Sequence, residues 1–283
     1  MQLRLAGGYA RRGAVATRLA ALLHADGLPL RLGSAHPDDL TPPSGVPTTR
    51  LALTDPADFP TALTGVKTVF LYASPDRVTD FITHAEQAGV EHIVLLSSSS
   101  VLGPAPEDDP LAASHLTVED ALLASSITTT ILRPGSFASN ASAWAWPIKA
   151  GRPVSLPFPD AHTDPIHELD VAESARTVIR ELRYHGGTFT LSGPESLSFT
   201  EQIDQLARVT GSPASIKRVT REEWKEEMAE YVPGKYADAL LNWWESNDGK
   251  PVALTRAVEE LTGHPARPFT TWAADHMADF TTG

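Results

Sequence analysis

A glycine-containing turn near the start of the chain reads Gly7-Gly8-Tyr9-Ala10-Arg11-Arg12-Gly13. A short apolar stretch, residues 2–6, precedes it, and the alanine- and leucine-rich stretch 14–25 follows with the spacing of a helix. A strand, a glycine turn and a helix in this order can bind a dinucleotide phosphate, because backbone N–H groups at the helix start face the anion. The turn therefore predicts a dinucleotide site at the start of that helix.

The positions of this turn have different roles. Gly7 permits the tight turn and Gly13 lets the helix approach the strand, whereas Ala10 stands where a second glycine would let the backbone approach the pyrophosphate. Arg11 and Arg12 place positive charge at the helix start and so compensate for the methyl group of Ala10. We expect all five residues to contact the cofactor. The alternative for Arg11 and Arg12 is that they are exposed surface residues that bind no ligand.

The end of the second strand usually decides between NAD and NADP, through an acid for the ribose 2′-hydroxyl or a base for the 2′-phosphate. Here the segment reads Leu32-Gly33-Ser34-Ala35-His36 and holds neither an acid nor an arginine. We expect Ser34 to line the cofactor site. Arg11 or Arg12 can bind a 2′-phosphate, so the sequence favours NADP(H), with NAD(H) as the alternative.

Strand-like and helix-like segments alternate through the first half of the chain. Short strands are expected at 28–32 and 50–53, and apolar runs at 68–72 and 92–96 are bounded by turn residues. Stretches 77–88 and 111–124 have helical spacing, and 128–132 is a β-branched run. This alternation predicts βαβ crossovers, and hence an α/β fold with a Rossmann-type parallel sheet covered by helices on both faces.

The second half of the chain has a different character. Residues 144–165 are rich in proline and aromatic residues without a sustained period, and mostly helical patterns follow. We expect a dinucleotide-binding core over residues 1–150, with later segments such as 160–192 packing back on it. Residues 193–283 then form a smaller, mostly helical C-terminal substrate lobe.

The composition narrows the function further. The 283 residues include no cysteine, which excludes disulfides, thiolate metal sites and a cysteine nucleophile, and fits a reducing compartment. A net charge of −12 repels phosphate backbones and anionic lipids. No segment approaches the roughly 20 apolar residues of a membrane span, and the first residues lack a signal peptide's apolar stretch. We expect a cytoplasmic protein with a small-molecule substrate and no nucleic-acid or membrane partner; a homodimer is compatible with this.

Several further motifs, in their order along the chain, resemble the NmrA-like branch of the atypical short-chain dehydrogenases. Besides the glycine turn, the segments that carry the resemblance are Val94-Leu95-Leu96-Ser97-Ser98-Ser99, Val118-Glu119-Asp120-Ala121-Leu122, Thr130-Ile131-Leu132-Arg133-Pro134-Gly135-Ser136-Phe137 with Asn140, Asp164-Pro165-Ile166-His167, Leu169-Asp170-Val171-Ala172, Leu191-Ser192-Gly193-Pro194-Glu195 and Trp272-Ala273-Ala274-Asp275-His276. The resemblance covers nearly the whole chain and implies the fold and a nucleotide site more firmly than one reaction.

We expect two further groups of residues to line the site, since ligands bind beyond the carboxyl ends of such strands. On the cofactor side they are Tyr72, Ser97 and Pro134. On the substrate side they are Ser99, Phe137, Asn140, Trp144 and His167. Trp144 and Trp146 are expected in a loop after the sixth strand, where they wall an apolar pocket or pack in the core.

Standard members of the family use a serine or threonine after the fifth strand with a Tyr-x-x-x-Lys pair. If Glu119 matches the acid that often follows this pair, Leu111 occupies the tyrosine position and His115 the lysine position. Ser98 and His115 are then the candidate catalytic residues, because a hydroxyl can donate to a carbonyl and an imidazole can act as acid or base. The alternatives are a serine that only caps the strand end and a histidine on the surface.

A cluster of histidines and acids could suggest a metal. His162, Asp164, His167 and Asp170 do not have the spacing of a helical ligand pair, so we expect no metal site. Asp170 and Glu173 instead have the Asp-x-x-Glu spacing of a helix capping box.

Three functions remain open at this stage. The first is an NAD(P)H-dependent oxidoreductase acting on a small aromatic or apolar substrate, such as a quinone, without the Tyr-x-x-x-Lys pair. The second is a non-redox isomerase, cyclase or lyase with a degenerate cofactor site and His115 or His167 as acid–base group. The third is a non-catalytic NADP(H) sensor that signals through a protein partner.

Overall fold

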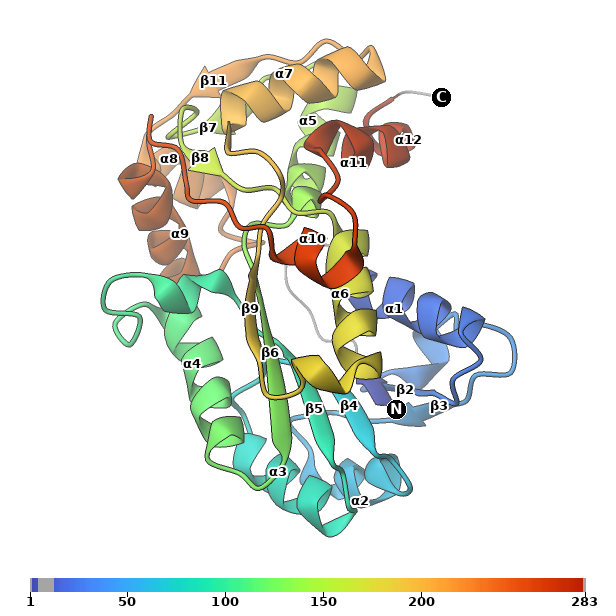
Figure 1. Ribbon diagram of the computed structural model, residues 1–283. Helices are drawn as coiled ribbons and strands as arrows, with labels where there is room; N and C mark the ends of the chain where they lie inside the picture. The colour runs from blue at the N-terminus through green and yellow to red at the C-terminus, as the bar shows by residue number, and fades with distance from the viewer. Residues whose placement is uncertain (1, 5–12, 282–283) are drawn as a thin grey trace. The chain divides into compact units, whose positions relative to one another are not determined.

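Parallel strands flanked by helices make up one part of the chain, as the computed structural model shows for residues 2–4 and 13–281 (Figure 1). Among these residues one sheet has seven strands in the order β3-β2-β1-β4-β5-β6-β9, and all neighbours pair in parallel. The strands are β1 (Gln2–Arg4), β2 (Arg31–Ser34), β3 (Thr48–Arg50), β4 (Thr68–Tyr72), β5 (His92–Leu96), β6 (Thr128–Pro134) and β9 (Thr188–Leu191). The Rossmann-type prediction is confirmed.

The helices beside this sheet form two layers (Figure 1). Helices α1 and α6 pack against each other, and α3 packs between α2 and α4. The bounds are α1 (Ala14–Ala25), α2 (Phe59–Leu63), α3 (Val78–Gln87), α4 (Pro110–Leu123) and α6 (Glu168–Arg180). All five residues of β5 are buried, because a parallel sheet with helices on both faces leaves its central strands no solvent face.

Alternate residues of the central strands enter one hydrophobic cluster with the α2–α3–α4 layer. Val69, Leu71, Ile93, Leu95 and Ile131 face this layer, as the two-residue period of a strand requires. In the other layer, α6 is tied to the end of α1 by ion pairs from Arg176 and Arg180 to Asp26. The side-chain hydrogen bond from Arg176 lowers the pKa of the Asp26 carboxyl.

The chain divides into two units, each described by itself. The first contains Met1–Pro134, Glu168–Leu191 and Glu260–Gly263; the second contains Gly135–His167, Ser192–Glu259 and His264–Gly283. The sequence placed residues 135–150 in the core, whereas here they belong to the second unit. The chain returns to the first unit within α10 (Ala257–Thr262).

The second unit is mostly helical, with two small sheets that the sequence analysis missed. Its strands are β7 (Val154–Leu156), parallel to β11 (Ile216–Arg218), and β8 (His162–Thr163), antiparallel to β10 (Leu197–Ser198). Its other helices are α5 (Ala145–Lys149), α7 (Phe199–Thr210), α8 (Arg221–Glu227), α9 (Gly234–Ser246), α11 (Phe269–Asp275) and α12 (Met277–Phe280). None of the helices in the described ranges combines the length and apolar character that a membrane crossing needs.

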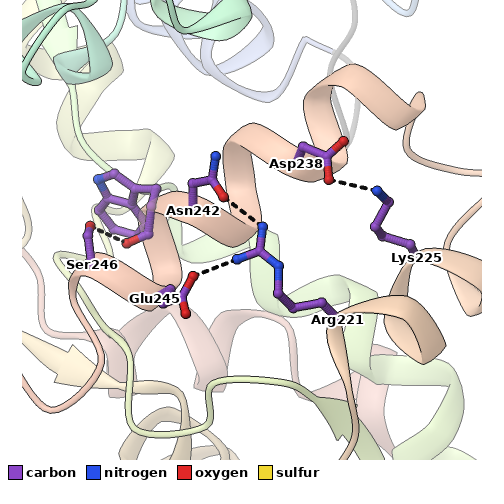
Figure 2. A network of polar contacts seen from close by, with 7 residues as sticks. Arg221, Lys225, Asp238, Asn242, Glu245 and Ser246 are labelled. Atoms are coloured by element: carbon purple, nitrogen blue, oxygen red, sulfur yellow. Dashed lines mark hydrogen bonds and ion pairs between the residues drawn. The ribbon is translucent and has the colours of Figure 1, made fainter.

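Polar contacts tie α8 to α9 in this unit, and Figure 2 shows them from close by. Arg221 donates to Glu245 at 2.7 Å and to Asn242 at 2.6 Å, and Lys225 donates to Asp238 at 2.7 Å. Behind this exposed network, the two helices share a small apolar cluster. The basic groups of α8 are thus engaged within the helix pair.

Some predicted elements were displaced or wrong. The strands predicted at 28–32 and 50–53 are found at Arg31–Ser34 and Thr48–Arg50. Pro29 lacks the N–H that a ladder needs, which explains the later start of β2. The expected irregular stretch 144–165 instead contains α5, β7 and β8.

The two tryptophans of this stretch and one capping box also differ from expectation. Trp144 ends a 3₁₀ helix (Ala138–Trp144), and Trp146 lies in α5, so neither lies in a loop. The capping box predicted for Asp170 is wrong, because α6 begins two residues earlier, at Glu168.

Candidate cofactor and active site

The described part of the phosphate-binding turn begins at Gly13, directly before α1. Gly13 has φ of 80°, a left-handed conformation that favours glycine, and its carbonyl accepts a hydrogen bond from the Thr17 amide at 2.8 Å. It brings no capping side chain, and the first turn of α1 carries no acidic residue. The amides of this 12-residue helix therefore face no competing carboxylate from its own first turn.

Four other residues predicted for this turn, Gly7, Ala10, Arg11 and Arg12, lie outside the described residues. Tyr72, at the end of β4, contacts the first turn of α1. Its hydroxyl accepts a hydrogen bond from the Ala16 amide at 3.2 Å, and burial raises the pKa of the phenol. Tyr72, predicted to line the cofactor, thus fixes α1 to the end of β4.

The strand order reverses where β1 lies between β2 and β4. Ligands of open parallel sheets bind at such a point, outside the carboxyl ends of the strands. Both Gly13 and Tyr72 lie at this edge. The left-handed glycine, the helix start whose N-cap residue brings no side chain and the strand reversal fit a dinucleotide, whose phosphates would be held by backbone amides at the start of α1.

At the tip of β2, the structure adds a cation that sequence reasoning missed. Ser34 is buried and its hydroxyl accepts from the His36 amide at 3.0 Å. Arg50, its register partner on β3, donates Nη1 to the Ala35 carbonyl at 3.0 Å, and its Nε lies 3.2 Å from Asp58 Oδ1. The Arg50 side chain is nevertheless 57% exposed. No local pattern could reveal it, because the residue comes from the neighbouring strand.

A polar triad joins Ser97, the residue after β5, to Arg133 on β6 and Glu119 on α4. Ser97 donates its hydroxyl to Glu119 Oε1 at 2.5 Å, Arg133 donates Nε to the same oxygen at 3.0 Å, and Arg133 Nη2 pairs with Oε2. Glu119 is only 1% exposed, so its charge is held by these partners. The Ser97 hydroxyl, predicted for the cofactor, is therefore directed into this triad.

The next two serines differ in their contacts. The Ser98 hydroxyl accepts from the Ser100 amide at 3.2 Å and caps the 3₁₀ helix Ser99–Leu102, which matches the capping alternative. The half-buried Ser99 makes no hydrogen bond through its hydroxyl to any described residue. Within the described part of the chain, Ser99 and Ser100 are thus the serines of this run whose hydroxyls make no hydrogen bond, and the Ser100 hydroxyl is buried.

His115 lies on α4, one helical turn before Glu119. Its Nδ1 atom is buried and has no hydrogen-bond partner within the described ranges. Burial lowers the pKa of the imidazole, and the nearby Glu119 charge opposes this in part. Burial therefore favours the neutral form of the His115 imidazole. Leu111 lies one turn earlier, on the same helix.

Four of the five substrate-side candidates, Phe137, Asn140, Trp144 and His167, lie in the second unit. Ser99 lies in the first unit, as does Pro134, the buried last residue of β6. Phe137 is half-buried and pairs with Ile166 in an isolated parallel bridge, and Asn140 is exposed. His167 is 1% exposed, with Nε2 at 3.2 Å from Asp275 Oδ2.

Trp144 belongs to the hydrophobic core of this unit. Its ring meets Phe199 edge-on, with ring centroids 5.8 Å apart, and the residue is 9% exposed. Core packing, the alternative to a pocket wall, is therefore the role that these contacts support.

Asp164, which the sequence analysis weighed as a metal ligand, is a buried carboxyl of the second unit. It is 9% exposed, and its Oδ1 accepts a hydrogen bond from the Ser136 amide at 3.0 Å. Burial raises the pKa of this carboxyl to about 6, against a partial lowering by the amide. Perturbed carboxyls of this kind cluster at functional sites.

Comparison with known proteins also indicates a nicotinamide dinucleotide site. A family model described as NAD(P)H-binding matches residues 12–182. A (4-alkanoyl-5-oxo-2,5-dihydrofuran-3-yl)methyl phosphate reductase of Streptomyces griseus is 33% identical over 95% of this chain and 96% of its own. An NAD(P)H azoreductase of Xenophilus azovorans is 29% identical over 83% of this chain and 84% of its own.

Solved structures agree on the fold. The NADPH-dependent quinone oxidoreductase of Escherichia coli, in complex with NADPH, superposes with a TM-score of 0.78 at 19% identity and covers 97% of this chain and 98% of its own. The resemblance to NmrA-like short-chain dehydrogenases is thereby confirmed.

Proposed function

Because this chain belongs to the NAD(P)H-binding family, we propose that it is a reductase whose substrate is a small apolar or aromatic molecule with a double bond conjugated to a carbonyl group. Relatives of this chain include proteins named as a reductase, an azoreductase and a dehydrogenase, and the protein is an NAD(P)H-dependent oxidoreductase. The finer assignment rests on the polar groups at the carboxyl edge of the sheet in the first unit.

The observation that carries the proposal is the neutral imidazole of His115, with its buried and unpartnered Nδ1 atom among the described residues. A neutral imidazole can donate a hydrogen bond to a carbonyl oxygen without transferring its proton. Such a group suits an acceptor that is already activated by conjugation, because the substrate then needs polarisation more than a strong acid.

The remaining residues of the edge have supporting roles in this proposal. The bound nicotinamide supplies the hydride. Ser99 donates its hydroxyl to the substrate, Ser98 holds the loop by capping it, and the Ser97–Glu119–Arg133 triad keeps α4, and with it His115, in place. Relatives named for a dihydrofuranone phosphate and for azo compounds are consistent with conjugated acceptors.

We also propose that NADP(H) is preferred over NAD(H), and that Arg50 contributes to the choice. The guanidinium is held at the tip of β2 by Ala35 and Asp58, yet over half of its side chain is exposed. The segment 32–36 carries no acid that would hold a ribose 2′-hydroxyl. A positive charge at this place favours a 2′-phosphate.

The test is a turnover assay of the purified full chain. NADPH is mixed with a panel of quinones, unsaturated lactones, azo compounds and simple unconjugated aldehydes, and the near-ultraviolet absorbance of the nicotinamide is followed. We expect oxidation of NADPH with conjugated acceptors and little with the aldehydes. Turnover restricted to aldehydes, or tight NADPH binding without oxidation by any acceptor, contradicts the proposal.

A further inference from the structure

We propose that two copies of this chain associate through their second units, with a basic patch of one copy docked on an acidic patch of the other. The basic patch consists of Trp146 and Lys149 on α5 and of Arg152, three residues after this helix. The acidic patch consists of exposed residues of α8 and of the segment after it, namely Glu222, Glu226, Glu227, Glu230 and Tyr231. Both patches belong to one unit, so each copy offers both halves of the contact.

Helix α5 buries one side and exposes a tryptophan on the other. Ile148 and, one turn before it, Trp144 enter the hydrophobic core of the unit. Trp146 is instead 65% exposed, and Met277 is exposed on α12, which packs against α5. A single exposed apolar side chain is ordinary, but tryptophan and methionine on neighbouring helices are typical of the centre of a protein interface.

Positive charge accompanies this tryptophan. The Arg152 guanidinium lies over the Trp146 ring, with Cζ 5.0 Å from the ring centroid, and Lys149 is exposed one helical turn after Trp146. Residues 138–159 contain these two cations and no acid, in a chain whose net charge is −12. Neither cation has an ion-pair partner among the described residues. The basic patch thus combines an aromatic anchor with two unpaired charges, and an acidic surface is its complement.

The packing of α8 on α9 explains why the glutamates of α8 are not neutralised within the chain. Arg221 and Lys225 are turned toward α9 and form ion pairs with its acids (Figure 2). Trp224, on the same helix, is buried in the apolar cluster of this helix pair. The glutamates of the acidic patch occupy the exposed surface that remains, and they form no ion pair with any residue that the structure describes. Tyr231, 62% exposed, adds an aromatic ring to this patch.

The charges favour a second copy of the chain as the occupant of the basic patch. The complementary surface is part of the same unit and is therefore always present at the same concentration as the basic patch. Opposite charges steer the copies together, and burial of the Trp146 ring stabilises the contact once it has formed. When a two-fold axis relates the copies, the contact occurs twice and the assembly closes as a dimer. We expect a reversible dimer with a dissociation constant of about 1–10 µM.

Charge reversal tests the contact in the purified full chain. The variant Lys149→Glu with Arg152→Glu carries two acidic patches, and the variant Glu226→Lys with Glu227→Lys carries two basic ones. In sedimentation velocity we expect the wild type to dimerise and each variant alone to associate at least about 100-fold more weakly. An equimolar mixture of the two variants should form dimers again, because each reversed patch then meets its complement on the other chain.

Two further variants separate the patch from general effects of charge. Lys67→Glu with Arg183→Glu reverses two exposed cations of the first unit and changes the net charge by the same amount as the reversal of the basic patch. This control should dimerise like the wild type. Trp146→Ser keeps both charges of the patch and should weaken the dimer by about 10-fold. Circular dichroism spectra show whether each variant is folded.

The salt dependence of the wild type is a readout that needs no variant. The dimer should weaken by about 10-fold between roughly 0.05 and 0.5 M sodium chloride, because salt screens exposed charges. A wild-type chain that is monomeric up to about 100 µM, or a dimer that does not respond to salt, overturns the proposal. Dimers of either reversal variant alone, or a mixture of folded variants that stays monomeric, overturn it as well. None of these measurements involves turnover, so the proposed function is tested separately.

Discussion

Arg133 on β6 holds both carboxylate oxygens of Glu119 on α4, through Nε to Oε1 at 3.0 Å and through Nη2 to Oε2. The Ser97 hydroxyl completes the set from the end of β5. Glu119 is 1% exposed, and the Arg133 side chain is 20% exposed. This pair joins the helix that carries His115 to the two strands beside it.

Removing one partner of the Glu119–Arg133 pair should destabilise the protein more than removing both partners. Arg133→Met leaves a buried carboxylate without its cation, so we expect the free energy of unfolding to fall by about 3–5 kcal/mol in urea titrations. The double variant Glu119→Leu with Arg133→Met removes both charges and should recover most of this loss. A double variant as unstable as the single one would contradict the account of a paired buried charge.

His115 should matter for the reaction and not for cofactor binding. We expect His115→Leu to lower kcat by about 100-fold with conjugated acceptors, because a hydrogen bond to the developing charge is lost. NADPH affinity, measured by ligand fluorescence, should stay within about twofold of the wild type, since only a contact to the substrate is removed. Thr117→Ala, an exposed change on the same helix, serves as the control; an equal loss there would indicate damage to α4 rather than to the site.

Arg50 should affect the choice of cofactor. Arg50→Gln is expected to weaken NADPH binding by about 10-fold while leaving NADH binding nearly unchanged, because only the 2′-phosphate uses the charge. Arg31→Gln is the matched control, since Arg31 begins β2 at the opposite end and donates to the Ala62 carbonyl. If Arg50→Gln weakens both cofactors equally, its role is to hold β2 and β3 together.

Acid should destabilise the first unit through His92. This residue is 3% exposed and its ring stacks on His185 with centroids 3.7 Å apart. Burial first, and then the His185 charge, lower the pKa of His92 from 6.5 to about 4. Between these values the unfolded state binds the extra proton, so the stabilisation is complete above about pH 6.5 and is lost as pH falls toward 4.

The loss amounts to at most about 3 kcal/mol over this window. Urea unfolding at a series of pH values gives the free energy of unfolding as a function of pH. Between about pH 4 and 6.5 this free energy should depend less steeply on pH for His92→Phe than for the wild type. His24→Gln, on an exposed position of α1, should keep the wild-type slope. Equal slopes for His92→Phe and the wild type would remove His92 as the cause.

The parts of the fold that the sequence predicted well are those with strong local patterns. The strands Thr68–Tyr72 and His92–Leu96 and the helix Ala14–Ala25 have the predicted bounds, because continuous apolar runs and helical spacing are local signals. The strands β7 and β8 were missed, because they are very short and lie among prolines. Their pairing is with distant segments, Ile216–Arg218 and Leu197–Ser198, and no local period records it.

The sequence identified several residues of the candidate site by their type, but it did not reveal which residues they contact. Ser98 and His115 were identified from the chain, but the capping role of Ser98 needed the geometry of the next helix. Arg50 reaches the tip of β2 only through the register of neighbouring strands, and Asp164 accepts from the Ser136 amide, 28 residues away in the sequence. Such pairings depend on tertiary packing, which composition and spacing do not encode.

The most direct test of the account follows the hydride itself. NADPH carrying deuterium at its transferable position is incubated with the full chain and a conjugated acceptor, and the product is analysed by mass spectrometry. For an acceptor reduced at carbon, such as an unsaturated lactone, the account predicts one deuterium in each product molecule, at the carbon that gained the hydride. For a quinone or an azo compound, whose new O–H or N–H bonds exchange with water, it predicts loss of deuterium from the cofactor at the same rate as reduction. Product formed without consumption of NADPH, or with no deuterium leaving the cofactor, would contradict it.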